Sequence, residues 1–142
     1  NNLGVIYQRQ GLEQKALLAF KKASQLSSFS LTPVFNLAQI YLKYGFSRRA
    51  RKLLEVLLRK SPNDDEALNG VAVSYLQQNK LSKALEYFNR ITNSRKFTSE
   101  VGINYSLTLK LLGQEKEAIS AFENISTSEM GSYSSYYKKV SL

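Results

Sequence analysis

The chain has 142 residues and a formal net charge of +9, from 20 Lys and Arg against 11 Asp and Glu, with neither cysteine nor histidine. Their absence excludes disulfides, thiol nucleophiles, cysteine–histidine zinc sites and histidine-based catalytic triads. No apolar run reaches the roughly 18 residues that a membrane-spanning helix needs. We therefore expect one soluble domain without catalytic residues, metal or cofactor. A cysteine-free chain suits the cytoplasm and an oxidising bacterial periplasm equally, so its compartment stays open.

Apolar residues recur at helical spacing in paired segments along the chain. In chain order the pairs are residues 3–9 with 17–23, 35–43 with 48–59, 68–77 with 82–91, and 103–111 with 116–125. Each pair predicts a helical hairpin. Between the hairpins, Thr32 before Pro33, Asn63 with Glu66, and Thr98 are typical of helix amino termini, and Asn63 with Glu66 predicts a capping box.

A period of 34 residues relates these hairpins. It is marked by Ala16, Ala50, Ala84 and Ala118, each followed four residues later by Phe20, Leu54, Phe88 or Phe122. Five residues before each alanine stands Gly11, Gly45, Asn79 or Gly113, which predicts the turn inside the hairpin. Because a lone hairpin cannot bury both of its faces, such a period indicates hairpins stacked on one another.

These residues resemble the tetratricopeptide repeat (TPR) family over about residues 1–126. The second unit carries the family pattern as Leu37-Ala38-x-x-Tyr41, Gly45, Ala50, Leu54 and Pro62, and the other units follow it less completely. The resemblance implies an all-α fold, a right-handed α-solenoid of stacked antiparallel helix pairs. Another solenoid of helical hairpins is the alternative.

The register divides the chain into units of about residues 1–30, 31–64, 65–98 and 99–132, within a single domain spanning 1–142. Residues 133–142 fall where a fifth unit would begin, and we expect either a partial repeat or a capping helix there. Both ends resemble cuts within a longer protein, and exposed half-repeats could stack between chains and produce oligomers.

In the family, the first helix of each unit lines a concave groove that binds peptides or partner helices. By register the groove residues here would be Asn2, Val5, Arg9, Phe35, Asn36, Gln39, Lys43, Asn69, Val73, Gln77, Ile103, Asn104, Leu107 and Lys110. The amides could bind an extended backbone, and Phe35, Ile103 and Leu107 could hold apolar anchors. Alternatively, Phe35 and Ile103 only complete the packing between repeats.

The positive charge is concentrated in the second unit, where residues 31–64 hold seven basic and two acidic residues. The resemblance places its second helix on the convex side, with a basic patch of Arg48, Arg49, Arg51, Lys52, Arg59 and Lys60. This patch is either a solvated face that keeps the array soluble or a docking surface for an acidic protein or anionic surface. Nucleic acid is the least favoured partner, because the repeat template accounts for most of the aromatic residues.

TPR domains that grip heat-shock chaperone C-termini use a lysine, asparagine and arginine clamp. The corresponding positions here are Asn1, Val5, Asn36, Glu66 and Gly70, of which only Asn36 matches. We therefore do not expect that partner.

The resemblance leads us to expect a non-catalytic scaffold that binds a protein or peptide, possibly in a bacterial envelope, pilus or secretion assembly. Electrostatic docking through the basic patch and a regulatory role within a larger enzyme are the alternatives.

Overall fold

The computed structural model describes residues 8–15, 18, 31–92, 98–123 and 125, and within them the chain is helical with no strand. The helices are α2 (Thr32–Lys43), α3 (Ser47–Lys60), α4 (Asp65–Gln77), α5 (Leu81–Thr92), α6 (Ser99–Leu111) and α7 (Glu115–Glu123). Residues 8–15 are also helical. The predicted segments 35–43, 48–59, 68–77, 82–91 and 103–111 all lie inside these helices, and α7 covers most of 116–125. The predicted all-α solenoid is confirmed.

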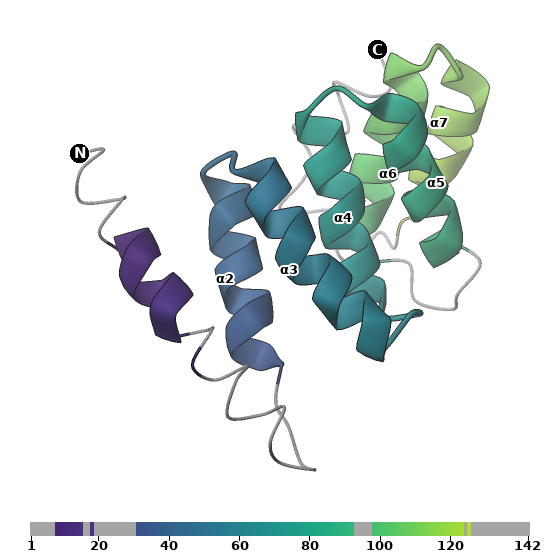
Figure 1. The fold of residues 1–142 in the computed structure, drawn as a ribbon. Coiled ribbons are helices and arrows are strands. Elements are labelled where there is room, and N and C mark those ends of the chain that lie inside the picture. Colours follow the sequence, from purple (N-terminus) through teal and green to yellow (C-terminus); the bar gives the residue numbers. More distant parts are fainter. Residues whose placement is uncertain (1–7, 16–17, 19–30, 93–97, 124, 126–142) are drawn as a thin grey trace.

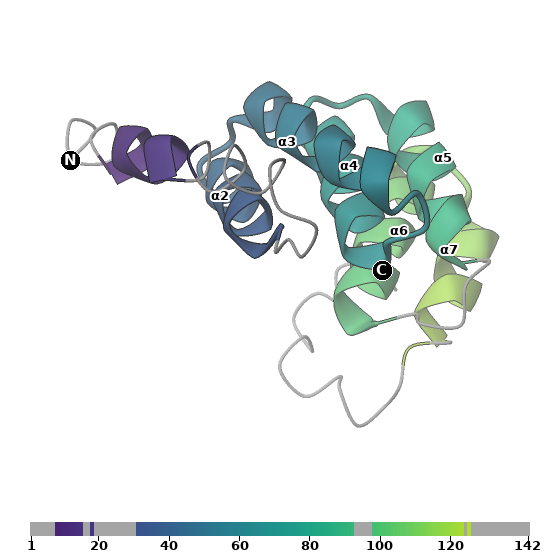
Figure 2. The same cartoon turned by 60° about the horizontal axis from the view of Figure 1, so that its bottom comes forward.

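The helices succeed one another in space in the order of the chain, from α2 at one side to α7 at the other (Figures 1 and 2). Each helix contacts the next one, and α4 also contacts both α2 and α6. No comparable contact joins α3 to α5 or α5 to α7. The first helices of the hairpins, α2, α4 and α6, therefore form a continuous layer, whereas the second helices are joined through them.

The three described turns between paired helices share one backbone solution. After α2, the Gly45 amide donates to Leu42 O at 3.1 Å and the Phe46 amide donates to Tyr41 O at 2.8 Å. This pair of bonds is the Schellman motif, whose central residue must adopt a positive φ. Equivalent bonds follow α4 and α6, and the central residues have φ of 79° at Gly45, 58° at Asn79 and 84° at Gly113.

The fourth predicted turn, at Gly11, is wrong. Residues 8–15 are helical through this glycine, which is exposed and has nothing near its missing Cβ. Glycine allows a turn but does not impose one, and here a helix crosses the position. The other residues predicted to form the first unit, including 17, 20 and 23, lie outside the described residues, as do 126–142 with the predicted fifth unit.

The helix amino termini correct two more predictions. The cap of α4 is Asp64, whose side chain accepts from the Ala67 amide at 3.1 Å, so the capping box predicted at Asn63 is wrong. Thr32 is already inside α2, which begins without a side-chain cap. Thr98 caps α6 as predicted, accepting from the Val101 amide at 3.4 Å.

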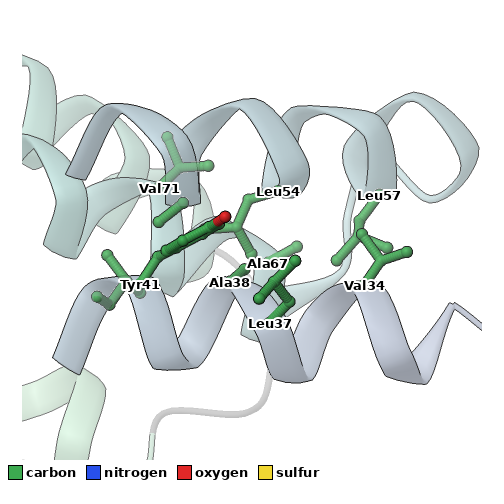
Figure 3. Packing of buried hydrophobic residues seen from close by; sticks show 10 residues of the cluster. Val34, Leu37, Ala38, Tyr41, Leu54, Leu57, Ala67 and Val71 are labelled. Carbon is green, nitrogen blue, oxygen red and sulfur yellow. The ribbon is translucent and has the colours of Figure 1, made fainter. Parts of the chain in front are cut away.

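The buried core runs the length of this array. Its first cluster joins α2, α3 and the start of α4, where Tyr41, Leu54 and Val71 lie against one another (Figure 3). A second cluster around Phe88 joins α4, α5 and α6, and a third joins α6 to α7. Partly buried side chains, among them Tyr75, pack against the first and second clusters at once. The alanines of the period, Ala50, Ala84 and Ala118, are all buried where helices cross.

Candidate functional site

The candidate site is the face shared by α2, α4 and α6, which we call the first-helix surface. Its described residues are those predicted to line the groove: Phe35, Asn36, Gln39 and Lys43 on α2, Asn69, Val73 and Gln77 on α4, and Ile103, Asn104, Leu107 and Lys110 on α6. Asn2 and Val5 lie outside the described residues. Since α4 contacts both of its neighbours, these side chains belong to one continuous layer.

The apolar members of the first-helix surface differ in exposure. Ile103 is buried, which favours the packing role among the two that the sequence left open for it. Phe35 and Val73 are partly buried and pack against the first core cluster. Leu107 is partly exposed on α6. The surface therefore offers limited apolar area between polar side chains.

Two of its amides already have structural partners. Gln77 Nε2 donates to Leu42 O at 2.8 Å, and Gln77 Oε1 accepts from Ser47 Oγ at 2.7 Å, so this side chain joins α4 to the α2–α3 hairpin. Asn69 Nδ2 donates to Glu100 Oε1 at 3.5 Å across α4 and α6. Asn36 on α2 is exposed.

Charge is distributed unevenly along these helices. The first turn of α4 contains Glu66 and that of α6 contains Glu100, whereas Lys43 and Lys110 occupy the last turns of α2 and α6. This is the arrangement that helix dipoles favour. It also gives the first-helix surface an acidic end at α4 and α6 and a basic end at α2 and α6.

Arg9, predicted on the groove, stacks over the α2–α3 turn. Its guanidinium carbon lies 4.4 Å from the centroid of the Phe46 ring, and Leu12 from the same helical segment packs against the first core cluster. In Figure 1 this segment runs beside α2.

The basic patch lies on α3, but Arg51 is used inside the fold. Its Nη1 donates to Gln78 Oε1 at 2.8 Å and to Ser74 Oγ at 3.3 Å, and its guanidinium carbon lies 4.1 Å from the centroid of the Tyr75 ring. Arg51 therefore ties α3 to α4. The other predicted members, Arg48, Arg49, Lys52, Arg59 and Lys60, are exposed.

Sequence reasoning missed two exposed apolar side chains near the carboxyl ends of the first helices. Leu111 is 55% exposed and Tyr44 is 42% exposed. The repeat period contained the signal for Leu111, because steps of 34 residues lead from Lys43 to Gln77 and then to Leu111. The predicted Lys110 is one residue out of that register.

Two further properties bear on chemistry. In the part of the chain that the structure describes, no three acidic side chains gather as a metal site, and no helix has the length and hydropathy to span a bilayer.

Comparison with known proteins identifies the repeats. The family model described as tetratricopeptide repeat matches residues 35–97. These residues are tetratricopeptide repeats. A search of the curated proteins finds no match.

Solved structures of MamA resemble the whole array. The MamA MSR-1 structure is 20% identical, with a TM-score of 0.56, and the alignment covers 85% of this chain and 74% of that one. The MamA AMB-1 structure is 21% identical, with a TM-score of 0.57, covering 87% of this chain and 72% of that one. At such identity the likeness concerns the fold, and it extends the repeat architecture beyond the family match.

Proposed function

We propose that the chain is a non-catalytic scaffold whose first-helix surface binds a segment of a partner protein. TPR arrays are protein-interaction modules, and stacked repeats present extended binding surfaces. The observation that carries the proposal is the continuous layer of α2, α4 and α6, which displays amides such as Asn36 and Gln39 beside the partly exposed Leu107. Amides can bond a peptide backbone, while an apolar side chain holds an anchor.

The test is capture of a partner from native lysate with matched baits. One bait is the parent chain, and the second carries Asn36→Ala, Gln39→Ala and Leu107→Ala on the first-helix surface. The third carries Arg48→Glu, Lys52→Glu and Arg59→Glu on α3. We expect a partner that is lost with the second bait and kept with the third. A partner that survives the second bait contradicts this proposal.

A second candidate is docking of an acidic protein segment on the exposed cations of α3. The observation that favours it is the first turn of α3, which contains Arg48 and Arg49, no acidic residue and no side-chain cap. Cations at a helix amino terminus oppose the dipole, and like charges four residues apart, such as Arg48 and Lys52, repel each other. A helix that keeps such unfavourable charges is a candidate for function.

Titration with poly-L-glutamate at increasing salt tests this second candidate. Binding that weakens steeply with salt and is lost with the α3 bait supports docking, because exposed charges are screened within about 10 Å at 0.1 M salt. Equal binding by the parent and the α3 bait excludes it. The place of the scaffold in a secretion or envelope assembly, or beside an enzyme, follows from the identity of the captured partner.

A further inference from the structure

An unmet acceptor lies beside exposed carboxylates at the amino-terminal ends of α4 and α6. Asn69 is only 9% exposed, and its Oδ1 is buried without a hydrogen-bond partner, while its Nδ2 donates to Glu100 Oε1. Glu66 precedes Asn69 by three residues, so the two share one face of α4. The three side chains therefore converge, and the one donor among them is already directed at Glu100.

No cation of the described residues neutralises this group. The salt bridge found there, Lys83 with Glu86, is on α5, and neither Glu66 nor Glu100 takes part in one. Both carboxylates are exposed in a chain whose net charge is +9. A local acceptor cluster in so basic a protein attracts positive charge of external origin.

Helix stability explains the carboxylates but not the amide. Acidic residues in first turns stabilise helices, which accounts for Glu66 and Glu100. The repeat does not require Asn69, because the residues 34 positions away in either direction are Phe35 and Ile103. Buried polar atoms are nearly always paired, so an open amide oxygen at this position needs its own explanation.

We propose that Glu66, Glu100 and Asn69 Oδ1 form an acceptor site for an arginine side chain of the bound partner segment. A guanidinium has five donors in a planar fork, so it can bond a carboxylate and a neighbouring carbonyl together. The Asn69–Glu100 bond is at the upper limit of hydrogen-bond length, and Glu100 is exposed, so its side chain can move to admit the donor. The inference rests on the proposed function and specifies the chemistry of its partner.

The experiment is a nuclear magnetic resonance titration of the full isotope-labelled chain with a blocked Gly-Arg-Gly tripeptide. The neutral citrulline analogue serves as the control ligand. We expect saturable shifts of the Asn69 side-chain amide signals with the arginine peptide and none with citrulline. Glu100→Gln should raise the Kd about ten-fold, as the loss of a charge-assisted hydrogen bond does.

Glu115→Gln is the matched control variant, because Glu115 is also an exposed carboxylate in a first turn, on α7. It removes the same charge and should leave the Kd unchanged. Equal weakening by both variants, shifts that do not saturate, or equal shifts with citrulline overturn the proposal. Partner capture separates this failure from failure of the scaffold. If Glu66→Gln with Glu100→Gln keeps a partner that the first-helix variant loses, the scaffold stands and the arginine site is wrong.

Discussion

A Cβ added to Gly70 of α4 would lie 2.7 Å from Cδ1 of Leu54 on α3. Leu54 is fully buried, so its side chain has little room to move away. Overpacking a core costs about 1–3 kcal/mol, and the better helix propensity of alanine returns about 1 kcal/mol. We therefore expect Gly70→Ala to lower the free energy of unfolding by about 1 kcal/mol in a urea titration.

The pair Gly70 and Leu54 can be checked by a double-mutant cycle. Leu54→Ala alone should cost about 2–5 kcal/mol. In that background the clash is absent, so Gly70→Ala should become neutral or stabilising. Simple additivity of the two changes would mean that the close approach does not exist.

The turns after α2 and α4 differ in how well their central residues fit a positive φ. Asn79 adopts φ 58° where the other two turns have glycine. We expect Asn79→Gly to raise the free energy of unfolding by about 0.5 kcal/mol, because only glycine adopts this region without strain. Gly45→Ala should lower it by about 1–2 kcal/mol. Thermal melts of the two variants should shift in opposite directions.

Ser106 on α6 is fully buried, and its Oγ has no hydrogen-bond partner. In the repeat register it corresponds to Ala38 and Ala72, both of which are fully buried. Ser106→Ala removes an unpaired hydroxyl at a position that already accommodates alanine, so we expect stabilisation of about 1 kcal/mol. Chemical denaturation measures it. A loss of stability would reveal a hydrogen bond at Oγ.

Arg51 and Arg48 on α3 offer a matched comparison of two arginines. Arg51→Ala removes two hydrogen bonds and the stacking on Tyr75, and should cost about 1.5–3 kcal/mol. Arg48 is exposed in the first turn, where a cation opposes the dipole, so Arg48→Ala should change stability by less than about 0.5 kcal/mol. Equal effects in a urea titration would contradict the distinction between the interior arginine and the surface one.

Tyr41 makes stability depend on pH above neutrality. Burial raises the pKa of Tyr41 to about 12 from its ordinary value of 10.0, and the neighbouring Glu13 adds to the rise. Because the folded state then holds its proton more tightly than the unfolded chain, the contribution is complete below about pH 10 and is lost towards pH 12. Stability should therefore fall with rising pH in this range.

Tyr41→Phe isolates this contribution. The hydroxyl has no hydrogen-bond partner within the described residues, so its removal should leave stability at pH 7 equal or higher. Between pH 10 and 12 the variant should lose less stability than the parent. Some slope should remain, because burial also raises the pKa of Tyr87 and of Tyr105. Identical pH profiles for the two proteins would contradict the assignment to Tyr41.

The candidate site could be predicted only in outline. Register alone placed Asn36, Gln39 and Leu107 on the face that α2, α4 and α6 share, since one period fixes which side of a helix each residue occupies. It could not show that Gln77 spends both ends of its amide on Leu42 and Ser47, because those partners come from another hairpin.

The sequence by itself determined the repeat, because small and large apolar residues 34 apart fit only one way of stacking hairpins. Ala50 and Phe88 are buried as that period requires. Only the tertiary structure decided what the polar side chains do. Arg51 and Arg48 are alike in the sequence, yet one bonds α4 and the other faces solvent. Likewise, Gly11 and Gly45 carry the same local signal, and only Gly45 forms the turn. The reason is physical: apolar burial follows the periodicity of one helix, whereas a hydrogen bond or a turn depends on which neighbouring helix lies within reach.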